Sequence, residues 1–136
     1  MITSDLIKAI KSLDTSIEYD DETQIFILKN VDTWLDICKT LKESSDFDYL
    51  MCITSLDLGD NDFGLAYNIH STRSKISIEF NLLFSLETAI PSIESIWKTA
   101  NWHEREAFDM MGIKFSDHPD MKRILLPQDW EGHPLK

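Results

Sequence analysis

The spacing of apolar residues predicts two helices in the first third of the chain. Between residues 2 and 13, apolar side chains recur mostly at three- and four-residue intervals, which places them along one side of an α-helix. The same spacing returns between residues 31 and 41. Five apolar residues form that stripe: Val31, Trp34, Leu35, Cys38 and Leu41. Each predicted helix therefore has one side for a core and one for solvent.

Alternation of apolar and polar residues predicts strands. Two short runs flank the acidic residues 20–22, which favours a β-hairpin: Ile17 with Tyr19, and residues 24–28. Three longer runs follow, with turn residues between them: 49–58, 63–69 and 76–82. Three consecutive antiparallel strands are the simplest arrangement of these runs.

Two further helical segments are predicted after Pro91. Ser92 is placed to cap the first, and apolar residues follow at helical spacing: Ile93, Ile96, Trp97 and Ala100. The second is a short helix with a charged surface that stops at Gly112, because glycine commonly follows the last residue of a helix. Three prolines then exclude a long helix or a central strand: Pro119, Pro127 and Pro134.

These elements predict an α+β fold. We expect a two-layer domain over residues 1–115, in which a mainly antiparallel sheet packs against helices. An extended, irregular tail over residues 116–136 follows it. Apolar residues of this tail lie between prolines and need a surface to cover them: Ile124, Leu125, Leu126 and Trp130. That surface is either another protein, which we expect, or the chain's own sheet.

Composition limits the partners and the compartment. The chain has 136 residues and a net charge of −11, so it repels phosphate backbones and we expect no nucleic-acid partner. No apolar stretch approaches the roughly 20 residues that cross a bilayer, and the first residues lack the apolar block of a signal peptide. We therefore expect a cytoplasmic protein without direct membrane insertion. Cys38 and Cys52 lie apart in apolar patterns, which predicts buried thiols and not a disulfide, metal or cluster site.

Candidate metal-binding residues gather between residues 101 and 118. One hypothesis is a small metal-dependent enzyme that uses His103, Glu106 and His118. The spacing argues against it, because a zincin helix has its second histidine four positions after the first and this chain has Ala107 there. Basic residues interleave with the carboxylates, which favours ion pairs, as between side chains four residues apart on a helix.

Other catalytic motifs are missing from the sequence. No serine lies in a Gly-x-Ser-x-Gly elbow, and neither GxGxxG nor GxxxxGK[ST] occurs among only four glycines. We expect no cofactor, no bound metal, no catalytic residue and no small-molecule substrate on this chain.

Several short runs after residue 100 together form a recognisable signature. They are Glu104-Arg105-Glu106, Asp109-Met110-x-Gly112-Ile113-x-Phe115, His118-Pro119-Asp120, Arg123-Ile124-Leu125 and Asp129-Trp130-Glu131-Gly132-x-Pro134-Leu135. This signature resembles that of the C-type subunit family of NADH:quinone oxidoreductases (respiratory complex I, NADH dehydrogenase), also found in membrane-bound NiFe hydrogenases. The chain departs from the family pattern at Met111, where an aromatic residue is common, and after Leu135, where relatives continue with a basic, tyrosine-containing stretch.

The resemblance implies a structural subunit without a redox centre. It would lie in the hydrophilic arm of a proton-translocating complex, beside subunits of the D, B and I types and peripheral to the inner membrane on its cytoplasmic side. The equivalent subunit of a membrane-bound hydrogenase is the alternative. The implied interface or signature-stabilising residues are Glu104, Arg105, Glu106, Asp109, Gly112, His118, Pro119, Arg123, Trp130 and Gly132.

Overall fold

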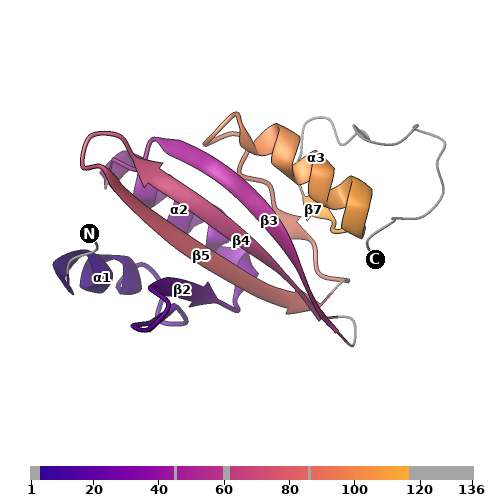
Figure 1. Ribbon diagram of the computed structural model, residues 1–136, viewed down its shortest axis with the longest axis horizontal. Coiled ribbons are helices and arrows are strands. Elements are labelled where there is room, and N and C mark those ends of the chain that lie inside the picture. Colours follow the sequence, from indigo (N-terminus) through magenta and orange to yellow (C-terminus); the bar gives the residue numbers. More distant parts are fainter. Residues whose placement is uncertain (1–3, 45, 60–61, 86, 117–136) are drawn as a thin grey trace.

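A computed structural model describes residues 4–44, 46–59, 62–85 and 87–116 of the chain (Figure 1). Its central sheet has five strands in the spatial order β1-β2-β5-β4-β3. They are β1 (Glu18–Asp20), β2 (Ile25–Leu28), β3 (Tyr49–Gly59), β4 (Asp62–Ser71) and β5 (Ile76–Ser85). The predicted hairpin is confirmed as β1 and β2, and the predicted antiparallel run is confirmed as β3, β4 and β5.

The hairpin joins the other three strands through one parallel pairing, between β2 and β5. Phe26 lies beside Phe80 in this pairing, and their rings stack with centroids 5.0 Å apart. The alternation pattern identifies both strands but carries no information about which strands become neighbours. The mixed character of the sheet is therefore a finding of the structure.

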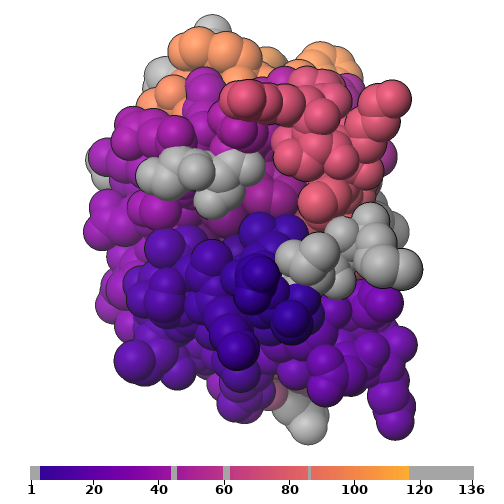
Figure 2. Space-filling view, turned by 90° about the vertical axis from the view of Figure 1, so that its left-hand side faces the viewer, coloured from indigo at the N-terminus to yellow at the C-terminus, as the bar shows by residue number. Residues whose placement is uncertain are grey.

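Within the described ranges, three α-helices accompany the sheet: α1 (Ser4–Lys11), α2 (Trp34–Ser44), which follows the 3-10 turn η1 (Val31–Thr33), and α3 (Ala100–Met111). Helix α2 crosses behind the sheet (Figure 1), and Trp34 packs against Tyr67 and Phe80 with ring centroids 4.8 and 5.1 Å apart. Helix α3 packs along β3. The indigo residues from Ser4 onward form one continuous surface with the purple residues that follow them in the chain (Figure 2). The predicted two-layer α+β fold is confirmed.

The core lies between the helices and one face of the sheet. Alternate residues of β4 and β5 are buried there: Phe63, Leu65, Tyr67, Ile69, Ile78, Phe80 and Leu82. The thiol of Cys38 is fully buried on α2 as predicted, whereas Cys52 on β3 is only half-buried. No helix among the described residues has the length and apolar character to cross a membrane.

The predicted helix from Ser92 to Ala100 is wrong. Its apolar residues are buried as expected, but residues 92–99 form successive turns, and α3 begins only at Ala100. Tertiary contacts hold these turns: the Trp97 indole donates to the Phe47 carbonyl at 3.1 Å. Two close turns give the same three- and four-residue spacing as a helix, so the local pattern could not separate them.

Two short strands bracket this loop and α3. Strand β6 (Ile90–Pro91) pairs in parallel with β7 (Phe115–Ser116), which brings the end of the α3 segment back beside the start of the loop. Ser116, the first residue of the predicted tail, therefore pairs with Pro91. Residues 117–136 lie outside the described residues, and the division into domain and tail stays a prediction.

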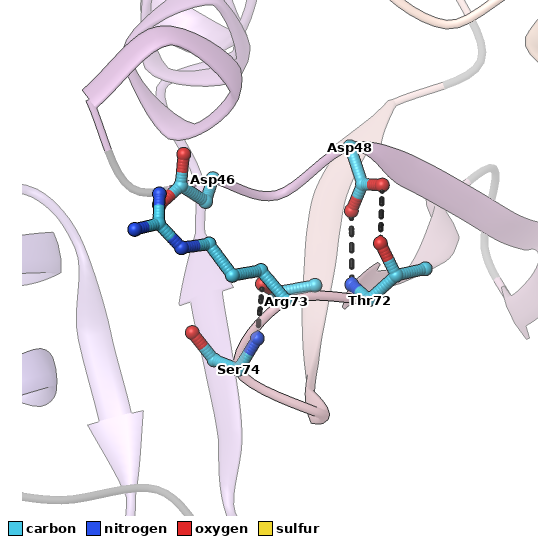
Figure 3. Close-up of polar contacts among 6 residues, drawn as sticks. Asp46, Asp48, Thr72, Arg73 and Ser74 are labelled. Carbon is cyan, nitrogen blue, oxygen red and sulfur yellow. Dashed lines mark hydrogen bonds and ion pairs between the residues drawn. The ribbon is translucent and has the colours of Figure 1, made fainter.

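A polar brace holds the start of β3 against the turn between β4 and β5 (Figure 3). The Asp48 carboxylate accepts hydrogen bonds from the Thr72 hydroxyl at 2.6 Å and from the Thr72 backbone N–H at 2.9 Å. These bonds lower the pKa of Asp48. Arg73 lies 3.3 Å from Asp46 in an exposed ion pair. The brace fixes a loop and involves none of the predicted site residues.

Candidate functional site

The first part of the signature lies on α3, and this helix ends before Gly112 as the sequence predicts. Gly112 follows the helix with a left-handed φ of 76°, and its N–H donates to the Phe108 carbonyl at 2.9 Å. This conformation favours glycine because a Cβ atom is disfavoured there.

The charged residues of α3 point in different directions. Glu106 is exposed, and His103 and Arg105 are half-buried. Glu104 and Asp109 are fully buried, with 0% of their surface exposed. The prediction of a charged helix surface is therefore right for Glu106 and wrong for Glu104 and Asp109.

Glu104 fastens α3 to the loop after β6. Its carboxylate accepts a hydrogen bond from the Ser92 hydroxyl at 2.6 Å and another from the Ile93 backbone N–H at 2.9 Å. The Ser92 oxygen in turn accepts the Glu94 N–H at 3.3 Å. One side chain of the signature thus sets the position of a loop that starts twelve residues earlier.

Burial shifts the protonation of this carboxyl group toward neutral pH. Loss of solvation raises the pKa of Glu104 to about 7, although the bonds from Ser92 and Ile93 favour the charged form. The pKa values of Cys38 and Tyr67 are also raised, first by their own burial and then by the Glu104 charge. With no exposed surface, Glu104 is placed to hold the fold together and not to reach a substrate.

A groove of about 240 Å³ runs between β3 and α3. Its walls include Thr54 and Ser55 from the strand and His103, Glu106 and Met110 from the helix. It is the place where the exposed side of the signature helix meets the edge strand of the sheet.

The described part of the chain contains no cluster of metal-binding side chains that would support the metal hypothesis. His103 and Glu106 both line the groove, but His118 lies outside the described residues. Within residues 4–44, 46–59, 62–85 and 87–116, no group of three His, Cys, Asp or Glu side chains is arranged to hold a metal ion.

The remaining signature residues also lie outside the described ranges: His118, Pro119, Arg123, Trp130 and Gly132. Two contacting residues were not expected from the sequence. Ser92 binds Glu104 where a helix cap was predicted, and the Lys42 ammonium donates to the Ile96 carbonyl at 2.6 Å. Lys42 and Ile96 are far apart in the chain, so no local pattern signals their contact.

The sequence matches a family model described as respiratory-chain NADH dehydrogenase, 30 Kd subunit, over residues 27–136. The chain belongs to this family. The match covers every signature run, so the resemblance to the C-type subunit of NADH:quinone oxidoreductase is confirmed.

Individual relatives agree with this family assignment. The C-type subunit of the NADH-quinone oxidoreductase of Chloroherpeton thalassium is 44% identical over 115 residues, which are 82% of this chain and 48% of the relative. The corresponding protein of Chlorobium phaeobacteroides is 34% identical over 90% of this chain and 76% of the relative. The chain thus spans about half the length of the first relative and three quarters of the second.

A solved structure with low sequence identity has a similar fold. A chain of the membrane-bound sulfane sulfur reductase, an archaeal respiratory membrane complex, superposes with a TM-score of 0.76 at 20% identity. The superposition covers 92% of this chain and 76% of that chain. At this identity the likeness concerns the fold alone.

Proposed function

We propose that this chain is a non-catalytic structural subunit of a proton-translocating NADH:quinone oxidoreductase. In this role it docks onto the subunits of the D, B and I types, which hold the clusters and bind quinone. It has a peripheral position on the cytoplasmic side of the membrane, held there through the complex.

The observation that carries this proposal is a covalent fusion among the relatives. A protein of Shewanella woodyi, named as a fused C/D-type subunit of NADH-quinone oxidoreductase, is 36% identical to this chain over 100% of the chain, which corresponds to 25% of the fused protein. A similar C/D fusion occurs in Phocaeicola vulgatus, 36% identical over 71% of this chain. Fusion keeps the two parts in one assembly, as expected for parts that work in contact.

The geometry of α3 is compatible with a bracing role. Glu104 accepts its hydrogen bonds from Ser92 and Ile93 of the same chain, inside the fold. The buried side of the signature helix therefore fixes the shape of the subunit, while His103 and Glu106 on the other side line an open groove. A rigid shape is what a docking subunit presents to its neighbours.

Co-expression with a D-type subunit from the same organism tests the proposal. The expected result is a complex with one copy of each chain that survives affinity purification and gel filtration, while purified chain alone carries no visible absorbance. Failure to form any complex with D-, B- or I-type subunits, singly or together, contradicts the docking role. Neighbouring genes for flavin-bearing NADH-oxidising subunits support the NADH-using complex, and hydrogenase genes alone support the other type.

A further inference from the structure

Among the described residues, the sheet is covered by helices on one face only. Trp34 of α2 contacts Tyr67 and Phe80, whose side chains define the covered face. Successive residues of a strand point to opposite faces, so the residues between these positions form the other face. In Figure 1 the broad surface of β3, β4 and β5 opposite α2 has no helix over it. We call it the open face.

Strand register arranges the open face into rows. The first row crosses three strands: Leu56, Gly64 and Leu83. A Cβ atom at Gly64 would lie only 3.3 Å from Leu56 Cδ1, so the leucine side chain extends over the glycine. The second row is Thr54, Ala66, Asn81, Ile27 and Glu18. Small and apolar residues therefore form a flat centre that another protein can approach closely.

The third row adds charge to this surface. It runs Cys52, Asn68, Glu79, Ile25 and Asp20. All five strands of the sheet lie within the described residues, and they contain five carboxylates and neither lysine nor arginine. The described basic residues lie instead in helices, turns and loops, for example Lys39 and Lys42 on α2. The open face is therefore mainly negative, with Lys29 beside Leu83 and Asp62 at one end of it, within a chain of net charge −11.

We infer that the open face docks a protein surface that carries lysine and arginine side chains around an apolar centre. This inference rests on the proposed function and names the surface and the partner chemistry. Leu56 and Leu83, both half-buried, supply the apolar centre, and Glu18 and Glu79 supply the charges that attract and orient a basic partner.

The charge of the chain favours a basic partner over a second copy. A second copy of the chain carries the same carboxylates and the same net charge of −11, so two open faces repel each other.

The test reverses charge on the two layers of the domain. Glu79→Lys and Glu18→Lys change the open face, and Glu43→Lys changes an exposed position on α2 as the matched control. Each full-length variant is first checked for wild-type unfolding, and Glu18→Lys, at an exposed edge position, carries the test if Glu79→Lys does not fold. Affinity for the D-type subunit is then measured between about 50 and 300 mM NaCl.

The expected result is a loss of about tenfold or more in affinity for the open-face variants, a weaker salt dependence than wild type, and a change of about twofold or less for Glu43→Lys. Wild-type binding that neither open-face variant alters overturns the inference and leaves the proposed function standing. If the wild-type chain binds none of the D-, B- and I-type subunits, singly or together, the proposed function itself is overturned. Self-association of the wild-type chain that Glu18→Lys changes would assign the face to a second copy and overturn the basic partner.

Discussion

Replacing Glu104 with glutamine should abolish a pH dependence of stability that the wild-type chain has near neutrality. The pKa of this carboxyl group is about 7 in the folded chain, against an ordinary value of 4.5. The folded chain thus holds the proton more tightly than the unfolded chain. Stabilisation by protonated Glu104 is complete below about pH 4.5 and is lost as the pH rises through 7.

The size of the effect follows from the two pKa values. The difference between 7 and 4.5, at about 1.36 kcal/mol for each pH unit, corresponds to roughly 3 kcal/mol in the free energy of unfolding. About 2 to 2.5 kcal/mol of it falls between about pH 5 and 8. Glutamine has nearly the same shape, and its amide can accept the Ile93 N–H and donate to the Ser92 oxygen, so the loop contact is kept.

Urea unfolding followed by tryptophan fluorescence measures this prediction for wild type, Glu104→Gln and Glu106→Gln. The free energy of unfolding of Glu104→Gln should gain about 2 kcal/mol relative to wild type as the pH is raised from about 5 to 8. Glu106 is exposed on the same helix, so Glu106→Gln should keep the wild-type profile. Parallel profiles for wild type and Glu104→Gln would refute the assignment of a buried, near-neutral carboxyl group.

Three further changes test other parts of the molecule. Gly112→Ala should cost about 1 to 2 kcal/mol in the free energy of unfolding because the left-handed φ of 76° disfavours a Cβ atom. Gly112→Asn should cost less, and equal losses for the two variants in chemical denaturation would argue against a backbone cause. Arg105→Lys removes the planar guanidinium that suits bidentate contact with a carboxylate, so we expect a lower melting temperature or weaker assembly. If neither the melting temperature nor assembly changes, the geometric role of Arg105 is contradicted. Deletion from Pro119 onward should change the free energy of unfolding by no more than about 1 kcal/mol. The same deletion should weaken co-purification with the D-type subunit by about tenfold or more. The reason is that burial of each apolar tail side chain is worth roughly 1.5 to 3 kcal/mol before association costs. An unfolded domain whose remaining folded fraction binds normally would show that the tail belongs to the core.

The sequence by itself determined the elements whose cause is local. Alternation identified β1, β4 and β5, and strand-like apolar runs identified β2 and β3. Helical spacing identified α1 and α2, and Gly112 marked the end of α3 because that end depends on the backbone conformation of Gly112 itself. The signature runs, which are also local, were sufficient to recognise the family.

Tertiary structure decided what depends on neighbours distant in the chain. The parallel pairing of β2 with β5 was not predictable because alternation gives a strand two faces but no partner. Residues 92–99 form turns where a helix was predicted, because partners in other parts of the fold satisfy the polar groups of these turns. These partners are Glu104, Lys42 and the Phe47 carbonyl. A charged residue normally faces solvent, so burial of Glu104 became visible only when Ser92 and Ile93 were found to supply its hydrogen bonds within the fold.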